Sequence, residues 1–192
     1  KKVNFKFFKD YKNLKIINVG RLTYQKDIIT LLKSFSELIK IRKARLLLVG
    51  NGTEENKIKK FVKNNELAEH VRIINFQKNP YNYISLADVK VLSSRFEGNP
   101  NILLEVACLK KLIISSNCKV GPSEILQKGR GGILYKVGDV KSLTKILKDL
   151  DVNNRISKNK INISYKYVKN NFKKDISKPF IEIIKNIKWK LL

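Results

Sequence analysis

Short runs of consecutive apolar residues alternate along the chain with longer segments whose apolar positions have helical spacing. The runs that we predict to be strands are residues 15–19, 45–49, 71–76, 89–92, 112–115 and 133–135. These runs are continuously apolar, whereas a strand with one solvent-exposed face alternates apolar and polar residues. The pattern therefore predicts a parallel sheet that helices cover on both faces, which is a doubly wound, Rossmann-like α/β fold.

The segments between these runs are predicted helices. They are residues 27–41, 53–64 with Thr53 as cap, 81–87, 100–110, and 140–150 with Asp139 as cap. Residues 1–14 show no clear period and are interpreted as an incoming linker, which leaves 15–152 as the sheet domain. Residues 153–192 form a predicted C-terminal helical tail whose apolar positions suit packing on a partner lobe. The alternative for this basic, amphipathic tail is an anionic membrane surface.

Ligands of doubly wound folds bind at the carboxyl ends of the parallel strands. That rule brings five loops around one crevice: residues 20–26, 50–53, 76–80, 93–101 and 116–124. In the fourth loop, Asn99 is a favourable helix cap and Pro100 a favourable first helical residue. The amides at this helix start are expected to point back at residues 95–98 and to favour an anion there.

Glu105 stands out because the rest of its predicted helix is apolar on all faces. An isolated buried carboxylate is unfavourable, so we expect either a basic side chain or a ligand with hydroxyl donors beside it. Glu97, in the loop before this helix, is expected to face the same crevice. Two carboxylates around a helix start would suit a ligand with an anionic middle and hydroxyl-rich ends, such as a nucleotide-sugar. The alternative is a Glu105 that pairs with a core Arg or Lys.

Arg21 and Lys26 bracket the first loop. A cation at the start of a helix opposes the helix dipole, so this placement favours a phosphate between the two side chains. Arg21 can bind two phosphate oxygens, and Lys26 acts as a point charge. In a chain with 41 Lys and Arg residues, chance placement is the alternative.

Other chemical signals are weaker. The Gly50-Asn51-Gly52 turn permits a close backbone approach, but no Gly-x-Gly-x-x-Gly is present, so we do not expect a nicotinamide cofactor. Asp149 and Asp151 have the letters of a metal-binding Asp-x-Asp but close a helix remote from the crevice. No cluster of His, Cys and carboxylates has metal-ligand spacing, and we predict no metal or other cofactor.

The formal net charge of +25 attracts polyanions such as nucleic acid, an anionic membrane or phosphorylated substrates. The Lys residues are scattered over almost every predicted helix, so a composition bias is the alternative. Cys108 and Cys118 lack metal-like spacing and indicate reduced thiols in a cytoplasmic protein. The longest apolar runs are far shorter than the roughly 20 residues that span a bilayer.

Five motifs occur in order at the predicted strand ends. They are Gly20-Arg21 with Lys26, Gly50-Asn51-Gly52, Glu97-Gly98-Asn99-Pro100 with Glu105, Gly121-Pro122-Ser123-Glu124-Ile125, and Gly131-Gly132. In this arrangement residues 15–150 resemble the nucleotide-sugar lobe of the retaining, two-lobed glycosyltransferases (GT-B fold, family 4). The resemblance is greatest to the bacterial members that build lipid-linked oligosaccharides, capsule or lipopolysaccharide. It implies metal-independent transfer of a hexose or N-acetylhexosamine from a UDP-sugar to a glycan or lipid-linked acceptor.

The resemblance also implies residue roles. Arg21 and Lys26 would hold the donor diphosphate and stabilise its developing charge, and Glu97 would contact hydroxyls of the transferred sugar. Glu105 would bind the ribose hydroxyls. The other implied donor-binding residues are Gly20, Gly50, Asn51, Gly52, Phe76, Gln77, Lys78, Gly98, Asn99, Pro100, Asn101 and Ile102, of which residues 76–78 would border the base.

The family's amino-terminal lobe, which binds the acceptor, is not among these 192 residues, and residues 1–14 would lead in from it. We therefore expect this chain alone to bind the donor and to transfer little or nothing. The expected location is the cytoplasm, with peripheral contact to the inner face of the membrane. Two alternatives are a non-catalytic partner subunit that binds nucleotide or membrane, and a basic nucleic-acid-binding module, for which no recognition motif is visible.

Overall fold

Six parallel strands form one sheet in the order β3-β2-β1-β4-β5-β6. In this computed structural model, residues 6–171 are described. The strands are β1 (Leu14–Val19), β2 (Ala44–Val49), β3 (Val71–Ile74), β4 (Val89–Leu92), β5 (Leu112–Ser116) and β6 (Ile133–Tyr135). All five neighbouring pairs are parallel, so the predicted parallel sheet is confirmed.

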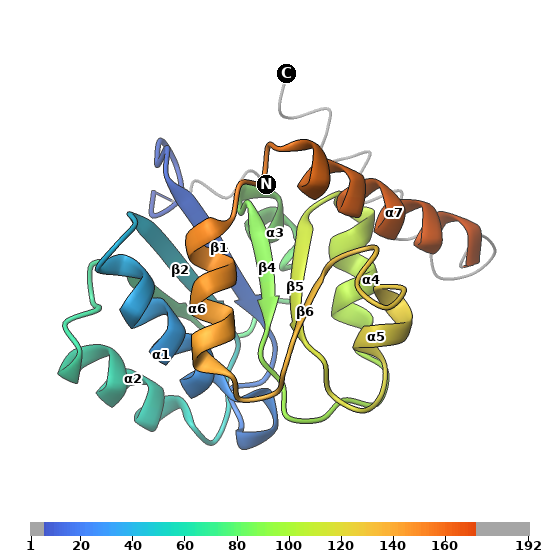
Figure 1. Cartoon of the computed structure of the whole chain (residues 1–192). Helices are drawn as coiled ribbons and strands as arrows, with labels where there is room; N and C mark the ends of the chain where they lie inside the picture. The colour runs from blue at the N-terminus through green and yellow to red at the C-terminus, as the bar shows by residue number, and fades with distance from the viewer. Residues whose placement is uncertain (1–5, 172–192) are drawn as a thin grey trace.

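Helices cover both faces of the sheet (Figure 1). They are the 3-10 helix η1 (Tyr24–Lys26) and the α-helices α1 (Ile28–Ile39), α2 (Glu55–Asn64), α3 (Tyr81–Leu86), α4 (Asn101–Cys108), α5 (Pro122–Ile125), α6 (Val140–Asp149) and α7 (Arg155–Asn171). Helices α1, α2 and α6 cover one face, and α3, α4, α5 and α7 cover the other. The predicted doubly wound fold is therefore confirmed.

Two apolar clusters, one on each face, explain why the strands are continuously apolar. Ile16 of β1 packs with Phe35 of α1 on the first face, whereas its neighbour Ile17 packs with Leu103 of α4 on the second. Successive side chains of a strand point to opposite faces, so every position of a central strand is buried here. Helix α7, the first part of the predicted tail, packs on α4 and β5. The apolar tail positions from 172 onward lie outside the described residues.

The segment predicted as a linker is fastened to the sheet where the structure describes it. Phe8 is 2% exposed and belongs to the second apolar cluster. The Arg45 guanidinium of β2 donates to the Phe7 carbonyl at 2.6 Å and lies over the Tyr11 ring, 4.2 Å from its centroid. Residues 7–11 therefore pack beside the amino end of β2. Strand β1 also begins one residue earlier than predicted, at Leu14.

Two predicted helix caps are wrong. Helix α4 begins at Asn101 with Pro100 as its cap residue, and Asn99 uses its backbone carbonyl, which accepts from the Asn101 amide at 2.9 Å. Helix α2 begins at Glu55, and its cap residue is Glu54 rather than Thr53. There the Leu22 carbonyl of a neighbouring loop accepts from the Glu54 amide at 2.9 Å, so no capping side chain is needed. Asp139, by contrast, caps α6 as predicted, since its carboxylate accepts from the Ser142 amide.

Strand β3 ends at Ile74, two residues before its predicted end. The Ile74 carbonyl accepts from the Gly50 amide at 2.9 Å, and the chain then leaves the sheet. Beyond that point the Asn51 side-chain carbonyl accepts from the Phe76 amide at 2.5 Å. A side chain thus replaces the ladder bond and turns residues 75–76 toward the loop after β2.

The glycines of Gly50-Asn51-Gly52 allow two loops to touch. A Cβ at Gly50 would lie 2.0 Å from the Gly20 carbonyl oxygen, and one at Gly52 would lie 2.2 Å from the Leu22 carbonyl oxygen. The Leu22 amide also donates to the Asn51 carbonyl at 2.8 Å. The close backbone approach predicted for this turn is therefore an approach to the loop after β1.

Replacing Gly50 with Ala should destabilise the fold by about 2 kcal/mol, because the new methyl group must push the two loops apart. The backbone φ of +147° at this position adds strain for any side chain. Urea unfolding of the variant measures the effect. The control is Gly98→Ala, where nothing lies within 4 Å of the added Cβ, and we expect a change below about 0.5 kcal/mol. Equal effects at the two positions would contradict this explanation.

Candidate active site

Strands β1 and β4 separate at the carboxyl end of the sheet. They pair only at Ile16↔Val89 and Ile17↔Lys90, whereas β1 pairs with β2 along its whole length. Past that point the Val91 carbonyl accepts from the Asn18 side-chain amide at 2.9 Å and from the Lys90 ammonium at 2.7 Å. The strand order reverses direction between β1 and β4, so this is the switch point at which doubly wound folds bind ligands.

A cavity of about 640 Å³ opens at this point, at the end of the sheet to which the strand arrows point in Figure 1. Its lining includes every predicted site residue except Gly52 and Gly98. Pro80, which belongs to the predicted loop 76–80, also lines it, whereas sequence reasoning missed Val19, Val49 and Tyr81. Val19 and Val49 are the last residues of β1 and β2, so the strand-end rule could have included them. Nothing in the sequence around Tyr81 indicated that it would line the cavity, because only the tertiary fold brings the start of α3 close to α4.

Lys26 and Glu97 form a buried ion pair on the cavity wall. The Lys26 ammonium donates to Glu97 Oε1 at 2.6 Å, and the Ser94 hydroxyl donates to the same oxygen at 2.6 Å. The side chains are only 15% and 5% exposed. An ammonium has three donors, so Lys26 can keep Glu97 and still bind a second anion. The pair therefore holds a cation at a fixed place between the loops after β1 and β4.

Arg21 lies at the exposed edge of the cavity. Its guanidinium donates to the Gln25 side chain at 3.0 Å, and Gln25 in turn donates to the Phe96 carbonyl at 3.0 Å. The Arg95 guanidinium forms an ion pair with Asp27 at 3.1 Å. These contacts join the loop after β1 to the loop after β4. They hold Arg21 and Lys26 on the same wall, where both cations face the cavity.

Glu105 is the carboxylate that lacks a direct partner. Among residues 6–171, no hydrogen bond and no ion pair within 4.0 Å reaches it, although the Lys90 charge acts on it. Burial raises the pKa of the Glu105 carboxyl above its usual range, and Lys90 partly opposes that rise. Burial, together with the Glu105 charge, raises the pKa of Tyr81 to about 12. Of the two sequence interpretations, core pairing lacks the expected ion pair, and hydroxyl donors from a ligand would satisfy the group.

The helix start that was predicted to bind an anion is partly used within the chain. The Asn101 amide donates to the Asn99 carbonyl, so this amide is not free for a phosphate. Gly121 packs against this turn, since a Cβ there would lie 2.4 Å from Pro100 Cδ. Of the backbone amides that residues 98–101 would offer to an anion, the one of Asn101 is therefore already used within the chain.

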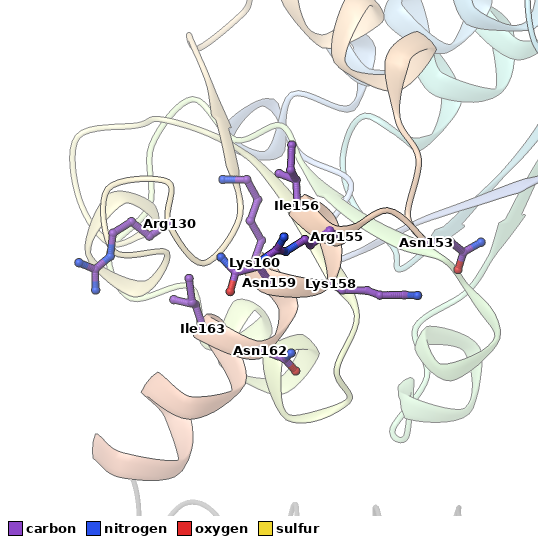
Figure 2. Close-up of a pocket in the computed structure, with 9 residues that line it drawn as sticks. All are labelled: Arg130, Asn153, Arg155, Ile156, Lys158, Asn159, Lys160, Asn162 and Ile163. Atoms are coloured by element: carbon purple, nitrogen blue, oxygen red, sulfur yellow. The ribbon is translucent and has the colours of Figure 1, made fainter.

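A second hollow, of about 840 Å³, lies beside the start of α7 and is lined by Arg130, Asn153, Arg155, Ile156, Lys158, Asn159, Lys160, Asn162 and Ile163. Its cations do not converge: Figure 2 shows the charged ends of Arg130 and Lys158 on opposite sides. The Lys160 ammonium already donates to the Gly129 carbonyl at 2.5 Å. This hollow is also remote from the carboxyl ends of the strands, so we do not assign it to the site.

Within residues 6–171, no group of three or more His, Cys, Asp and Glu side chains is placed to hold a metal ion. Within the same range, no helix has the length and apolar character needed to cross a bilayer.

A doubly wound fold with a cavity at its switch point has the arrangement in which such folds bind their ligands. The sequence matches the model of the family "Glycosyl transferases group 1" over residues 1–167. This chain therefore belongs to the group 1 glycosyltransferases.

Individual relatives agree with this assignment. An uncharacterized glycosyltransferase of Methanocaldococcus jannaschii is 36% identical over 62% of this chain and 30% of its own length. The amylovoran biosynthesis glycosyltransferase AmsD of Erwinia amylovora is 30% identical over 77% of this chain and 41% of its own. A crystal structure of TarM from S. aureus, in complex with UDP and other ligands, shares the fold with a TM-score of 0.77 at 17% identity. That match covers 91% of this chain and 35% of TarM, so the chain spans less than half the length of these proteins.

The buried ion pair predicts a strong coupling between Lys26 and Glu97. Lys26→Met should destabilise the protein by about 3 kcal/mol, because it leaves a carboxylate buried without its cation. Adding Glu97→Gln should recover part of that loss in a double-mutant cycle measured by urea unfolding. The control is Lys40→Met, which breaks an ion pair to Glu37 whose side chains are 63% and 53% exposed. Its effect should stay below about 0.5 kcal/mol, and a similar small effect at Lys26 would refute the coupling.

Glu105 should reduce the stability of the unliganded protein at neutral pH. Burial raises the pKa of Glu105 in the folded protein above its value in the unfolded chain. The loss of stability is therefore absent below the unfolded pKa and fully present once the pH has risen through the folded pKa. Glu105→Gln should therefore raise Tm at pH 7 and leave it unchanged near pH 3. Thermal unfolding at the two pH values measures this, with the exposed Glu124→Gln as a control of equal charge. A lower Tm for Glu105→Gln at pH 7 would mean that the ionised carboxylate already has a stabilising partner.

Proposed function

We propose that this chain is the donor-binding half of a retaining glycosyltransferase that takes a hexose or N-acetylhexosamine from a UDP-sugar. The observation that carries the proposal is the cavity at the β1/β4 switch point, lined by Arg21, Lys26, Glu97 and Glu105. Two cations suit the two phosphates of a nucleotide-sugar, and an unpaired carboxylate suits the two hydroxyls of its ribose. UDP in the TarM complex supports this choice of nucleotide.

In this proposal the diphosphate lies between Arg21 and Lys26. The bond between the sugar C1 and the diphosphate oxygen breaks, and its electron pair stays on the diphosphate. The two cations stabilise that charge, which grows in the transition state. The acceptor oxygen forms the new bond to C1 on the same face, and its proton passes to the oxygen of the departing diphosphate. Glu97, fixed by Lys26 and Ser94, would bind hydroxyls of the sugar, and residues 76–78 would border the base.

The acceptor and the biosynthetic role form the second part of the proposal. We propose a glycan or lipid-linked acceptor, as expected for polysaccharide, capsule or lipopolysaccharide biosynthesis; the name of AmsD supports a polysaccharide role. A second lobe would hold this acceptor, so we expect donor binding without turnover from this chain by itself. Contact with an anionic membrane is a further expectation, which rests on the +25 charge and on the basic, amphipathic pattern of residues 153–192. Joining the chain to such a lobe and assaying transfer would separate a catalytic half from a non-catalytic nucleotide-binding subunit.

Calorimetric titration with UDP tests the proposal. The wild-type chain should bind UDP, and Glu105→Ala should weaken binding tenfold or more, because hydrogen bonds from two hydroxyls to a charged acceptor are lost. The matched control is Glu69→Ala, an exposed acid just before β3, at the opposite end of the sheet. It should bind UDP like the wild type.

Two results would overturn the proposal. The first is a wild-type chain that gives no UDP signal but binds duplex DNA tightly with a steep salt dependence, as expected of a basic nucleic-acid-binding module. The second is a Glu105→Ala variant, folded by circular dichroism, that binds UDP as well as the wild type. That result would place the nucleotide elsewhere than in this cavity.

A further inference from the structure

Lys90 is a fully buried lysine in the middle of the sheet. It lies on β4 and is 0% exposed, yet it is not paired with an acid: among the described residues, no carboxylate lies within 4.0 Å of its ammonium. Its one hydrogen bond goes to the Val91 carbonyl at 2.7 Å. Val89 and Val91 point to the α1 face and Leu92 to the α4 face. Alternation along β4 therefore directs Lys90 toward α4, where Glu105 lies.

The position of Lys90 relates it to the cavity. It sits at the last pair between β1 and β4, where the crevice opens, but it does not line the cavity. Three cavity residues act on its charge, each from a different element: Lys26 from η1, Glu97 from the loop after β4, and Glu105 from α4. Lys90 thus lies behind the wall that carries both carboxylates. A ligand in the cavity would not contact Lys90, but the charges of the two would interact.

We propose that Lys90 is a positioning residue of the donor site, a buried counter-charge that balances Glu97 and Glu105 and strengthens binding of the donor diphosphate. This inference rests on the proposed function. Without Lys90, the two carboxylates would cancel the charges of Lys26 and Arg21, and an anionic ligand would meet a wall with no net positive charge. With it, Glu105 can stay ionised for hydroxyl binding while the net field at the diphosphate remains positive.

The charge of Lys90 should depend on pH in the range in which cells work. Burial, and then the Lys26 charge, lower its pKa to about 7, and Glu97 and Glu105 oppose this. Diphosphate binding adds negative charge nearby, which raises that pKa again, so binding should take up a proton. UDP affinity should then fall as the pH rises above 7. Deprotonation of Glu105 has the opposite effect on hydroxyl binding, and Tyr81, with a pKa of about 12, does not titrate in this range.

The experiment measures UDP binding by the whole chain between pH 7 and 8.5, in two buffers of different ionisation enthalpy. At pH 7.5 the wild type should take up about half a proton, as expected for a pKa that moves upward by about one unit from 7. Its affinity should fall about three- to tenfold over the range, since one pKa unit corresponds to a factor of ten. Lys90→Met, which keeps the length of the side chain, should bind about three- to tenfold more weakly at pH 7 and lose both pH effects.

The control is Lys111→Met. Lys111 also has a pKa lowered by burial, but it precedes β5 and its charge partners are Asp88 and Lys15, at the amino ends of the strands. It should retain the wild-type pH profile. The ionisation of UDP itself, with a phosphate pKa of about 6, is common to all variants and cancels in the comparison.

The outcomes separate this inference from the proposed function. A wild type that binds no UDP refutes the proposed function. A wild type that binds UDP without proton uptake, and with no fall in affinity, overturns only the role of Lys90, and this measurement needs no variant. A Lys90→Met variant that binds more weakly by the same factor at every pH would show a packing role and would also overturn the inference.

Discussion

The separation of β1 from β4 is the constraint on which the rest of the site depends. Two strands that stop pairing after Ile17 and Lys90 leave carbonyl groups without ladder partners in the centre of a sheet. The Asn18 amide and the Lys90 ammonium satisfy the Val91 carbonyl instead. Because an unpaired buried carbonyl is costly, these two polar side chains make it possible for the crevice to open. Past this separation the loops after β1 and β4 meet again, where Lys26 of one loop pairs with Glu97 of the other.

The charges around this crevice are not arranged for the stability of the empty protein. One carboxylate, Glu97, is neutralised by Lys26, whereas Glu105 is half-buried with no direct partner and Lys90 is buried with no paired acid. A core built for stability alone would use apolar residues at both positions. Such local losses are typical of binding sites, where the ligand supplies the missing partners and the well-packed sheet supplies the compensating stability. On the proposed function, the ribose diol would supply the partner of Glu105 and the diphosphate would supply negative charge near Lys90.

The sequence predicted the strands well because all six are short apolar runs, and burial on both faces is visible without knowing the neighbours. It predicted most of the cavity because the strand-end rule depends only on strand direction. It missed what depends on residues far apart in the chain. Lys26 and Glu97 are 71 residues apart, so their ion pair could not be anticipated from local pattern. Thr53 failed as a cap because a carbonyl from another loop satisfies the helix. The burial of Lys90 was missed because it depends on the central position of β4 and on the helix that packs over it.

The overall excess of cations would attract any anionic ligand, but it would not distinguish one anion from another. Six ion pairs occur among residues 6–171. Four of them lie at the ends of the strands or between neighbouring turns of one helix. Most Lys and Arg side chains in this range are exposed to solvent. Charges in solvent are screened over about 8 Å at physiological ionic strength. Lys26 and Lys90 are withdrawn from solvent, so their fields are screened far less. On the proposed function, discrimination between a nucleotide-sugar and other anions would therefore come from these few buried groups and from Glu105, whose carboxylate would repel an anion that brings no hydroxyl donors.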